Sequence, residues 1–128
     1  MSFELPKLYP ITDRRLSGLS HAEQVARLSD GGATVVQLRE KHLGPREFYR
    51  EAEEALRVAR ERGVRLIIND RADIALALGA DGVHLGQDDM PPRAARASCS
   101  CARSGSRRAS SIARRKRLCV SRAREARN

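Results

Sequence analysis

The chain has 128 residues, of which 41% are hydrophobic and 3% aromatic, with 25 Lys and Arg against 16 Asp and Glu. This length suits one domain with a modest core of Leu, Ile, Val and Ala, and no apolar run is long enough to cross a bilayer, which argues against a membrane protein. The first residues lack the basic and apolar stretches of a secretory signal, so we expect a soluble cytoplasmic protein.

The first third of the chain predicts a strand, a helix and a second strand. Residues 8–12 form a short apolar run typical of a strand. Ser20 and Glu23 have the spacing of a capping box, which opens a helix that stops at Gly31. Residues 35–39 alternate in polarity with a period of two, which predicts the second strand.

The next third continues the same alternation. Pro45 opens the longest predicted helix, which ends at Gly63. Residues 64–68 are almost wholly apolar, as expected of a parallel strand covered on both faces. A short helix over 72–78 and a fourth strand over 82–85 follow, so the order argues for a parallel α/β sheet. The strand side chains that we expect to be buried are Val36, Leu38, Ile67, Ile68, Val83 and Leu85.

A weak internal repeat indicates how such a sheet would close. Residues 32–38 align with residues 79–85 at an offset of 47 residues, with Gly, Ala, Val and Leu recurring in register. Two βα units fit in that length, which is the module size of a (βα)8 barrel. A three-layer open sheet begins in the same way and stays an alternative. However, no Gly-x-Gly-x-x-Gly follows the first strand, which disfavours a dinucleotide-binding fold.

Polar and charged residues stand where these strands end. Gln37, Arg39 and Lys41 share one face of the second strand by the period of two, and Asp70 and Asp89 end later segments. Cations and carboxylates together are suited to gripping a polyphosphate, both by direct charge and through a bound divalent metal. Asn69 directly precedes Asp70 in the sequence and adds an amide group to this set.

Each of these groups also has an interpretation that needs no ligand. Arg39 and Lys41 would be solvated residues at a strand end, and Asp70 with Asn69 would cap the following helix. Asp89, with Asp88 before it, would form a polar turn ahead of two prolines.

The histidines do not suggest a catalytic base. We expect His84 to be a hydrogen-bonded residue of a strand, and His21 and His42 to lie on the surface. Residues 1–92 contain no Ser-His-Asp set, no Walker loop and no zinc-ligand cluster.

Four blocks of sequence closely resemble the thiamine-phosphate synthase family, in that family's order and spacing. They are residues 8–13, 37–41, 68–71 and 82–91, and the resemblance extends from about Leu8 to Arg96. The related thiazole tautomerases share the barrel but usually lack the Asn-Asp pair and the Gly-Gln-x-Asp block. Both are present here, so the synthase is the closer match and the tautomerase is the alternative.

The resemblance implies a fold and a reaction. The fold is α/β, the N-terminal half of a TIM (βα)8 barrel with about four parallel strands. The reaction is a transfer that joins hydroxymethylpyrimidine diphosphate to thiazole phosphate, giving thiamine phosphate and pyrophosphate. In such enzymes the pyrimidine diphosphate would contact Gln37, Arg39, Lys41 and Asn69, and Mg²⁺ would be held by Asp70 and Asp89.

The end of the chain differs sharply from the rest. Residues 93–128 contain 12 Lys and Arg against a single Glu, together with all three cysteines. Their Arg, Ser, Cys and Ala bias is that of a GC-rich gene read out of frame. We therefore expect a partial barrel over residues 1–96 and a disordered basic tail over 97–128, with little or no synthase activity from this truncated chain.

The tail also raises two alternatives to an enzyme. A flexible Arg-rich segment would bind nucleic acid without sequence specificity, although no recognisable nucleic-acid module is present. A half-barrel would also be able to fold as a homo-oligomer, with a structural role and no enzymatic activity.

Overall fold

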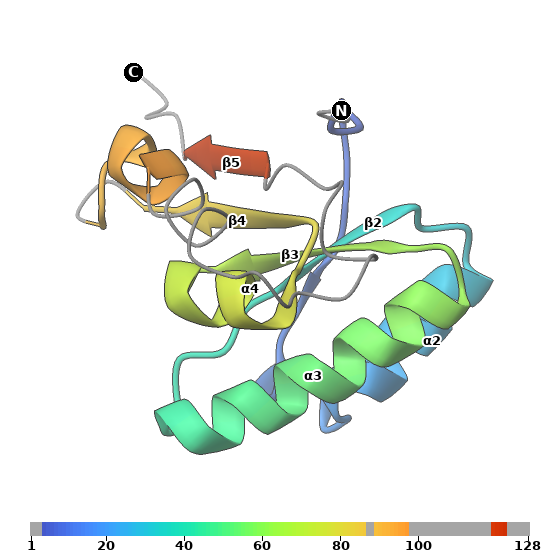
Figure 1. Cartoon of the computed structure of the whole chain (residues 1–128). Helices are drawn as coiled ribbons and strands as arrows, with labels where there is room; N and C mark the ends of the chain where they lie inside the picture. Colours follow the sequence, from blue (N-terminus) through green and yellow to red (C-terminus); the bar gives the residue numbers. More distant parts are fainter. Residues whose placement is uncertain (1–3, 87–88, 98–118, 123–128) are drawn as a thin grey trace, which may run out of the picture.

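The computed structural model describes residues 4–86, 89–97 and 119–122, and its framework is a five-stranded sheet (Figure 1). The strands are β1 (Ile11–Thr12), β2 (Val35–Leu38), β3 (Arg65–Asn69), β4 (Gly82–Leu85) and β5 (Cys119–Arg122). The helices are α1 (Arg14–Ser17), α2 (His21–Asp30), α3 (Pro45–Glu61) and α4 (Ala72–Leu78), and residues 92–97 are also helical. None of the described helices is long and apolar enough to span a membrane.

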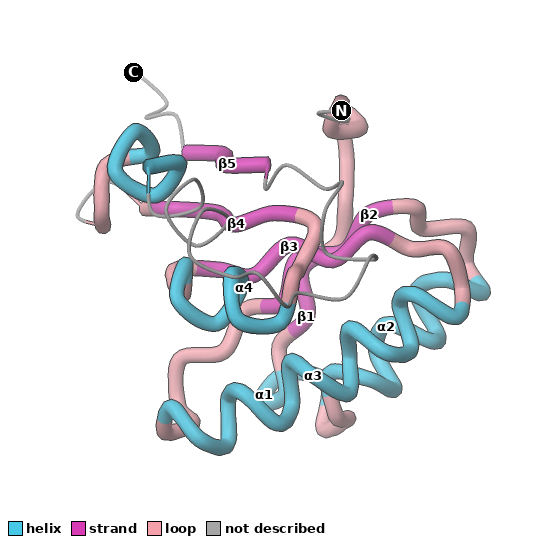
Figure 2. The backbone as a smooth tube through the Cα atoms, in the orientation of Figure 1, coloured by secondary structure: helices cyan, strands magenta, loops and turns pink. Residues whose placement is uncertain are grey.

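The strand order distinguishes a barrel from an open sheet. The order is β1-β2-β3-β4-β5, and every neighbouring pair is parallel. In a doubly wound sheet the order reverses at a switch point, whereas in a barrel each strand lies next to its predecessor. The helices α2, α3 and α4 all lie on one face of this sheet (Figures 1 and 2). The predicted partial (βα)8 barrel is therefore confirmed.

The core lies between the sheet and these helices. Val36, Leu38, Ile68, Val83 and Leu85 are fully buried and belong to one hydrophobic cluster with residues of α3 and α4. The parallel register explains this, because Val36 pairs with Leu66 and Leu38 pairs with Ile68, which stacks side chains of the same face. The sixth predicted core residue, Ile67, is also buried, at 1% exposure.

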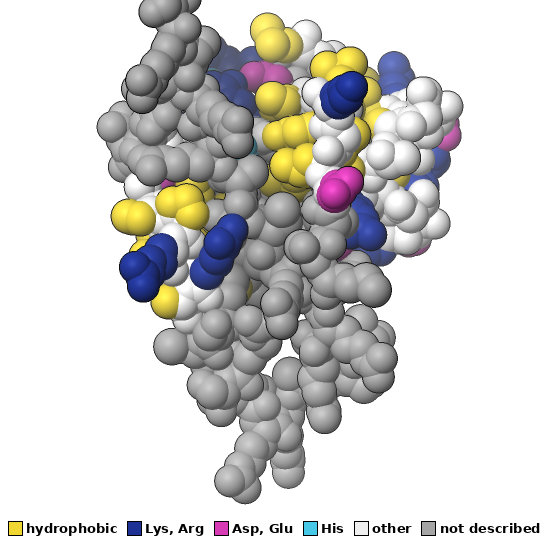
Figure 3. Space-filling model, turned by 90° about the horizontal axis from the view of Figure 1, so that it is seen from above, with side chains coloured by type: hydrophobic (Ala, Val, Ile, Leu, Met, Phe, Trp, Pro, Cys, Tyr) yellow, Lys and Arg dark blue, Asp and Glu magenta, His cyan; other side chains and the backbone are white. Residues whose placement is uncertain are grey.

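The opposite face of the sheet is turned away from the helices and carries part of the apolar surface. Hydrophobic side chains are visible in the view from that side (Figure 3). Ile11, on the edge strand β1, is 53% exposed, and Leu8 just before it is 89% exposed. Among the described helices, α2, α3 and α4 all lie on the other side of the sheet (Figure 1).

Local sequence signals account for most helix boundaries. Ser20 and Glu23 form the predicted capping box, with the Glu23 backbone N–H donating to the Ser20 hydroxyl at 3.2 Å and the Ser20 N–H donating to the Glu23 carboxylate at 2.9 Å. Pro45 is the first residue of α3. Helix α4 ends at Gly79, whose φ of 66° is the left-handed conformation that glycine adopts readily.

Several boundaries differ from the predictions. Strand β1 has two residues, not five, and β2 ends at Leu38, so the alternation of faces does not continue to Arg39. Strand β3 begins and ends one residue later than predicted. Helix α1 was not predicted, because one turn capped by Asp13 is too short to show an amphipathic pattern.

A further difference lies in the segment predicted to be a disordered tail. Residues 119–122 form β5, which pairs in parallel with β4 so that Val83 lies opposite Val120. The prediction is therefore wrong for these four residues, and for residues 98–118 and 123–128 it lies outside the described part of the chain. A strand edge offers unpaired N–H and C=O groups, and pairing by a short extended segment satisfies them. Four residues are too few to give a periodic signal.

Candidate functional site

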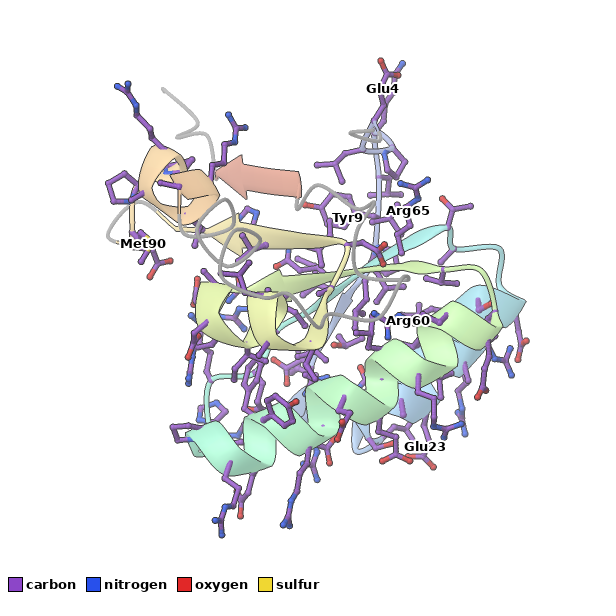
Figure 4. The ribbon with its side chains drawn as sticks, in the orientation of Figure 1. Glu4, Tyr9, Glu23, Arg60, Arg65 and Met90 are labelled. Carbon is purple, nitrogen blue, oxygen red and sulfur yellow. The ribbon has the colours of Figure 1, made fainter. Side chains whose placement is uncertain are left out.

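The polar residues predicted to be functional follow the carboxyl ends of β1 to β4. Because the strands are parallel, these ends form one rim of the sheet, which is where ligands bind in barrels and in open α/β sheets. Asp13 follows β1, Arg39 and Lys41 follow β2, and Asp70 follows β3. Beyond β4 the chain passes Gly86 towards Met90, which Figure 4 labels.

Asp70 is held in an uncommon backbone conformation. Its φ is 64°, the one positive value among the described non-glycine residues, and aspartate tolerates this region better than most side chains. Its N–H donates to the His84 carbonyl at 2.8 Å, which extends the pairing of β3 with β4 by one residue. In this conformation its carboxylate forms an ion pair with the Lys41 ammonium from the loop after β2.

The pKa of the Asp70 carboxyl lies below its ordinary value. Burial acts to raise this pKa, but the hydrogen bond from Lys41 and the charge of Lys41 outweigh it, together with interactions with Asp89 and Asn69. Asp70 is therefore ionised at neutral pH, as a metal ligand must be. The same interactions gather Lys41, Asn69, Asp70 and Asp89 into one group.

Gly86 provides the space between the two carboxylates. A Cβ at this position would lie 3.0 Å from Asp89 Oδ2 and 4.0 Å from Asp70 Oδ1, so both acids converge on the volume that glycine leaves open. The Gly86 N–H donates to Asp89 Oδ2 at 2.7 Å and fixes that carboxylate. Two carboxylates, completed by water and phosphate oxygens, are a usual way of binding Mg²⁺. The described residues contain no larger cluster of Asp, Glu, His or Cys, and Asp88 lies outside them.

The capping interpretation of Asp70 does not hold. The N-cap of α4 is Arg71, whose side chain makes no capping hydrogen bond. Arg71 instead pairs with Asp73, with the guanidinium donating to both carboxylate oxygens at 2.7 and 3.0 Å.

Arg39 and Gln37 lie apart from this group. The Arg39 guanidinium is 3.6 Å from an oxygen of Asp13, so it leans towards β1, whereas Lys41 leans towards β3. Gln37 is 3% exposed and its amide is 3.5 Å from the hydroxyl of Tyr9, which lies on the side of the sheet away from the helices (Figure 4). Asn69 is 7% exposed. The structure thus joins four of the six predicted side chains and places Arg39 at one flank and Gln37 within the sheet.

Sequence reasoning missed three residues that shape the rim. Gly86 was included in a sequence block but given no role, although a glycine beside a carboxylate pair was a usable signal. Asp13 was not assigned as the partner of Arg39. His21, predicted to lie on the surface, is fully buried, because its polar partners come from two other segments of the chain.

Comparisons with known proteins agree with this geometry. The chain matches a protein-family model described as "Thiamine monophosphate synthase" over residues 8–104. It is 57% identical over 91 residues to the thiamine-phosphate synthase of Clostridium novyi, covering 70% of this chain and 45% of that protein. It is 56% identical over 90 residues to the thiamine-phosphate synthase of Syntrophomonas wolfei, covering 70% of this chain and 43% of that protein.

A solved structure supports the same comparison. The thiamine phosphate pyrophosphorylase of Pyrococcus furiosus superimposes with a TM-score of 0.72 at 34% identity, covering 91% of this chain and 48% of that one. The chain therefore spans about half the length of the relatives that it matches.

Proposed function

The chain belongs to the thiamine monophosphate synthase family, and from that premise we propose that it carries the diphosphate- and Mg²⁺-binding part of a transferase. The reaction joins hydroxymethylpyrimidine diphosphate to thiazole phosphate and gives thiamine phosphate and pyrophosphate. The observation that carries the proposal is the convergence of Lys41, Asp70 and Asp89 beside Gly86 at the carboxyl rim of the sheet.

The cationic side chains would hold the diphosphate from two sides of the end of β2. Arg39 leans towards β1 and Lys41 towards β3, so a diphosphate between them would meet both charges. Both cations are paired with carboxylates, and an ammonium on a flexible stem can exchange its partner for a phosphate oxygen. Gln37 and Asn69 would supply amide contacts from the sheet.

Asp70 and Asp89 are the residues that would hold Mg²⁺. The fit rests on two carboxylates that converge beside Gly86, which suits a hard cation with oxygen ligands. When bound, Mg²⁺ would neutralise negative charge on the diphosphate leaving group.

The chemistry needs no protein nucleophile. The bond between the pyrimidine methylene carbon and the diphosphate oxygen breaks, and its electron pair leaves with pyrophosphate. The methylene cation is delocalised into the electron-rich pyrimidine until the thiazole nitrogen donates its lone pair and forms the new C–N bond. Arg39 and Lys41 would act where negative charge develops, which is the main way in which fixed charges lower such a barrier.

The relatives favour this proposal over its alternatives. The two bacterial proteins at 57% and 56% identity are thiamine-phosphate synthases, rather than tautomerases or nucleic-acid-binding proteins. The cytoplasmic location, the oligomeric state and the low activity of this chain stay predictions.

Calorimetric titration of pyrophosphate into the 128-residue chain, with and without Mg²⁺, tests the proposal. We expect the unmodified chain to bind pyrophosphate only with Mg²⁺, and we expect Asp70→Asn and Asp89→Asn to lose this Mg²⁺-dependent binding. Asp30→Asn is the matched control, because it removes the same charge from an exposed residue at the end of α2, where it pairs with Arg62. Equal pyrophosphate affinity with and without Mg²⁺ in the unmodified chain would contradict the proposal. Formation of thiamine phosphate from both substrates is measured in parallel.

A further inference from the structure

A network of buried polar side chains connects the sheet to the loop that carries Arg39 and Lys41. The Thr12 hydroxyl on β1 is 2.7 Å from Nδ1 of His21, the first residue of α2. Nε2 of His21 is 3.1 Å from Oε2 of Glu40 in the loop after β2. The side chains of Thr12 and His21 are fully buried, and that of Glu40 is 5% exposed.

The ionisation of Glu40 fixes the position of one hydrogen on His21. Burial acts to raise the pKa of Glu40, but hydrogen bonds from the backbone of His42, from His21 and from the backbone of Lys41 outweigh it and lower the pKa below its ordinary value. An ionised carboxylate only accepts, so Nε2 of His21 carries the hydrogen. Nδ1 lies 2.7 Å from the Thr12 hydroxyl, which is also 3.4 Å from the Gln37 carbonyl, so each ring nitrogen has a polar partner.

Glu40 is the one residue that separates Arg39 from Lys41, and its side chain turns inwards while theirs form ion pairs at the rim. Its second oxygen accepts from the His42 backbone N–H at 2.8 Å, which closes a tight turn in the loop. The loop therefore has a fixed point at its centre. From this point Arg39 reaches the Asp13 carboxylate on one side and Lys41 reaches Asp70 on the other.

We propose that His21 is a positioning residue, which through Glu40 sets the conformation of residues 39–42 and so the placement of Arg39 and Lys41 on the diphosphate. This inference rests on the proposed function. A buried histidine and carboxylate are an expensive way to stabilise a core, since apolar side chains of similar size often serve as well. Their benefit is a loop with one geometry before the ligand arrives, which reduces the entropy lost on binding.

Two substitutions at His21 separate positioning from simple loss of packing. In His21→Gln the side-chain amide reaches the place of Nε2 and still donates to Glu40. In His21→Asn the shorter amide reaches only the place of Nδ1 and loses Glu40. Arg62→Gln is the matched control: Arg62 ties α3 to α2 through the Ala26 carbonyl and Asp30, at the end of α3 next to the start of β3.

The measurements are hydrogen exchange of the backbone amides by NMR and calorimetry with pyrophosphate and Mg²⁺. In His21→Asn we expect the His42 amide to exchange at least about tenfold faster and the pyrophosphate dissociation constant to rise about tenfold, as for the loss of one charged hydrogen bond. His21→Gln should restore both values, and Arg62→Gln should change neither. Exchange of the Val36 amide should stay slow in all three variants.

The outcomes separate this inference from the function on which it rests. Faster loop exchange in His21→Asn than in His21→Gln, in a chain that binds no pyrophosphate, would support the positioning and contradict the proposed function. Equal loop exchange in the two variants would overturn the positioning, whatever the affinity. If His21→Asn does not fold, Glu40→Gln weakens the contact between His21 and Glu40 from the side of the loop. Unchanged exchange of the His42 amide in that variant would also overturn the positioning role of His21.

Discussion

Replacing Gly86 with alanine would disturb the acidic pair without removing either carboxylate. The added methyl group would lie 3.0 Å from Asp89 Oδ2, 3.8 Å from Asp89 Cγ and 4.0 Å from Asp70 Oδ1. The backbone of Gly86 does not have a positive φ, so alanine is not strained there. The substitution therefore acts through the position of Asp89.

The size of the effect follows from these distances. Ordinary contact begins at 3.4 Å, so Asp89 Oδ2 must move by about 0.4 Å, and the 2.7 Å hydrogen bond from the Gly86 N–H opposes that movement. Mg²⁺ holds its oxygen ligands at about 2.1 Å in a nearly ideal octahedron and tolerates errors of about 0.2 Å. We therefore expect Mg²⁺ affinity to fall about tenfold, or about 1.4 kcal/mol.

The free energy of unfolding should change less than at an open glycine. Alanine restricts the unfolded chain, which by itself raises stability by about 0.4 to 1 kcal/mol, but the displacement of Asp89 opposes that gain. Urea denaturation and calorimetric titration of Mg²⁺ in the presence of pyrophosphate give the two quantities. Gly44→Ala is the control, because no atom lies within 4 Å of a Cβ there and its φ is −66°.

One result would refute the reasoning. If Gly86→Ala binds Mg²⁺ as tightly as the unmodified chain while Asp89→Asn does not, the metal does not occupy the space beside Gly86. The convergence of the two carboxylates would then be incidental to binding.

Further predictions concern the buried carboxylate, a helix cap and the core. The pKa of Glu40 is below its ordinary value of 4.5, so its charge stabilises the fold above about pH 4.5, and that contribution disappears as the pH falls further. The difference in unfolding free energy between the unmodified chain and Glu40→Gln should therefore be constant from about pH 6 to 8 and shrink below about pH 4.5. A difference that grows in acid would contradict this. Ser20→Ala should lower the free energy of unfolding by about 1 kcal/mol in urea, since it removes one side of the capping box, and an unchanged midpoint would show that the cap is dispensable. Ile68→Ala, at a fully buried position, should cost about 2 to 5 kcal/mol in the same assay, and a loss below about 1 kcal/mol would mean that the site collapses around the smaller side chain.

The sequence predicted the fold well where local signals and burial agree. Helix α4 and strand β4 have the predicted bounds, because Gly79 stops the helix and the apolar run after it is short. The buried strand residues were also correct, since an apolar parallel strand has few other places to lie. The barrel-like strand order was indicated by the repeat between residues 32–38 and 79–85.

The site was predictable as a set of residues but not as an arrangement. Strand periodicity put Arg39 and Lys41 on one face, yet β2 ends at Leu38 and the two cations diverge towards different carboxylates. His21 was expected on the surface, but it is fully buried. Its burial depends on Thr12 and Glu40, which lie 9 and 19 residues away in the chain, and no local pattern reports such contacts.

The ion pair between Lys41 and Asp70 has a consequence for how the ligands arrive. Before binding, the ammonium is a counter-charge for Asp70, so it offsets one of the two carboxylate charges that converge beside Gly86. Mg²⁺ alone would have to displace the ammonium, and a diphosphate alone would meet two half-buried carboxylates. Under the proposed function, the two ligands together would allow a double exchange, in which Lys41 would pair with phosphate and Asp70 with the metal. Each ligand should therefore raise the affinity for the other by the same factor, as a shared coupling free energy requires.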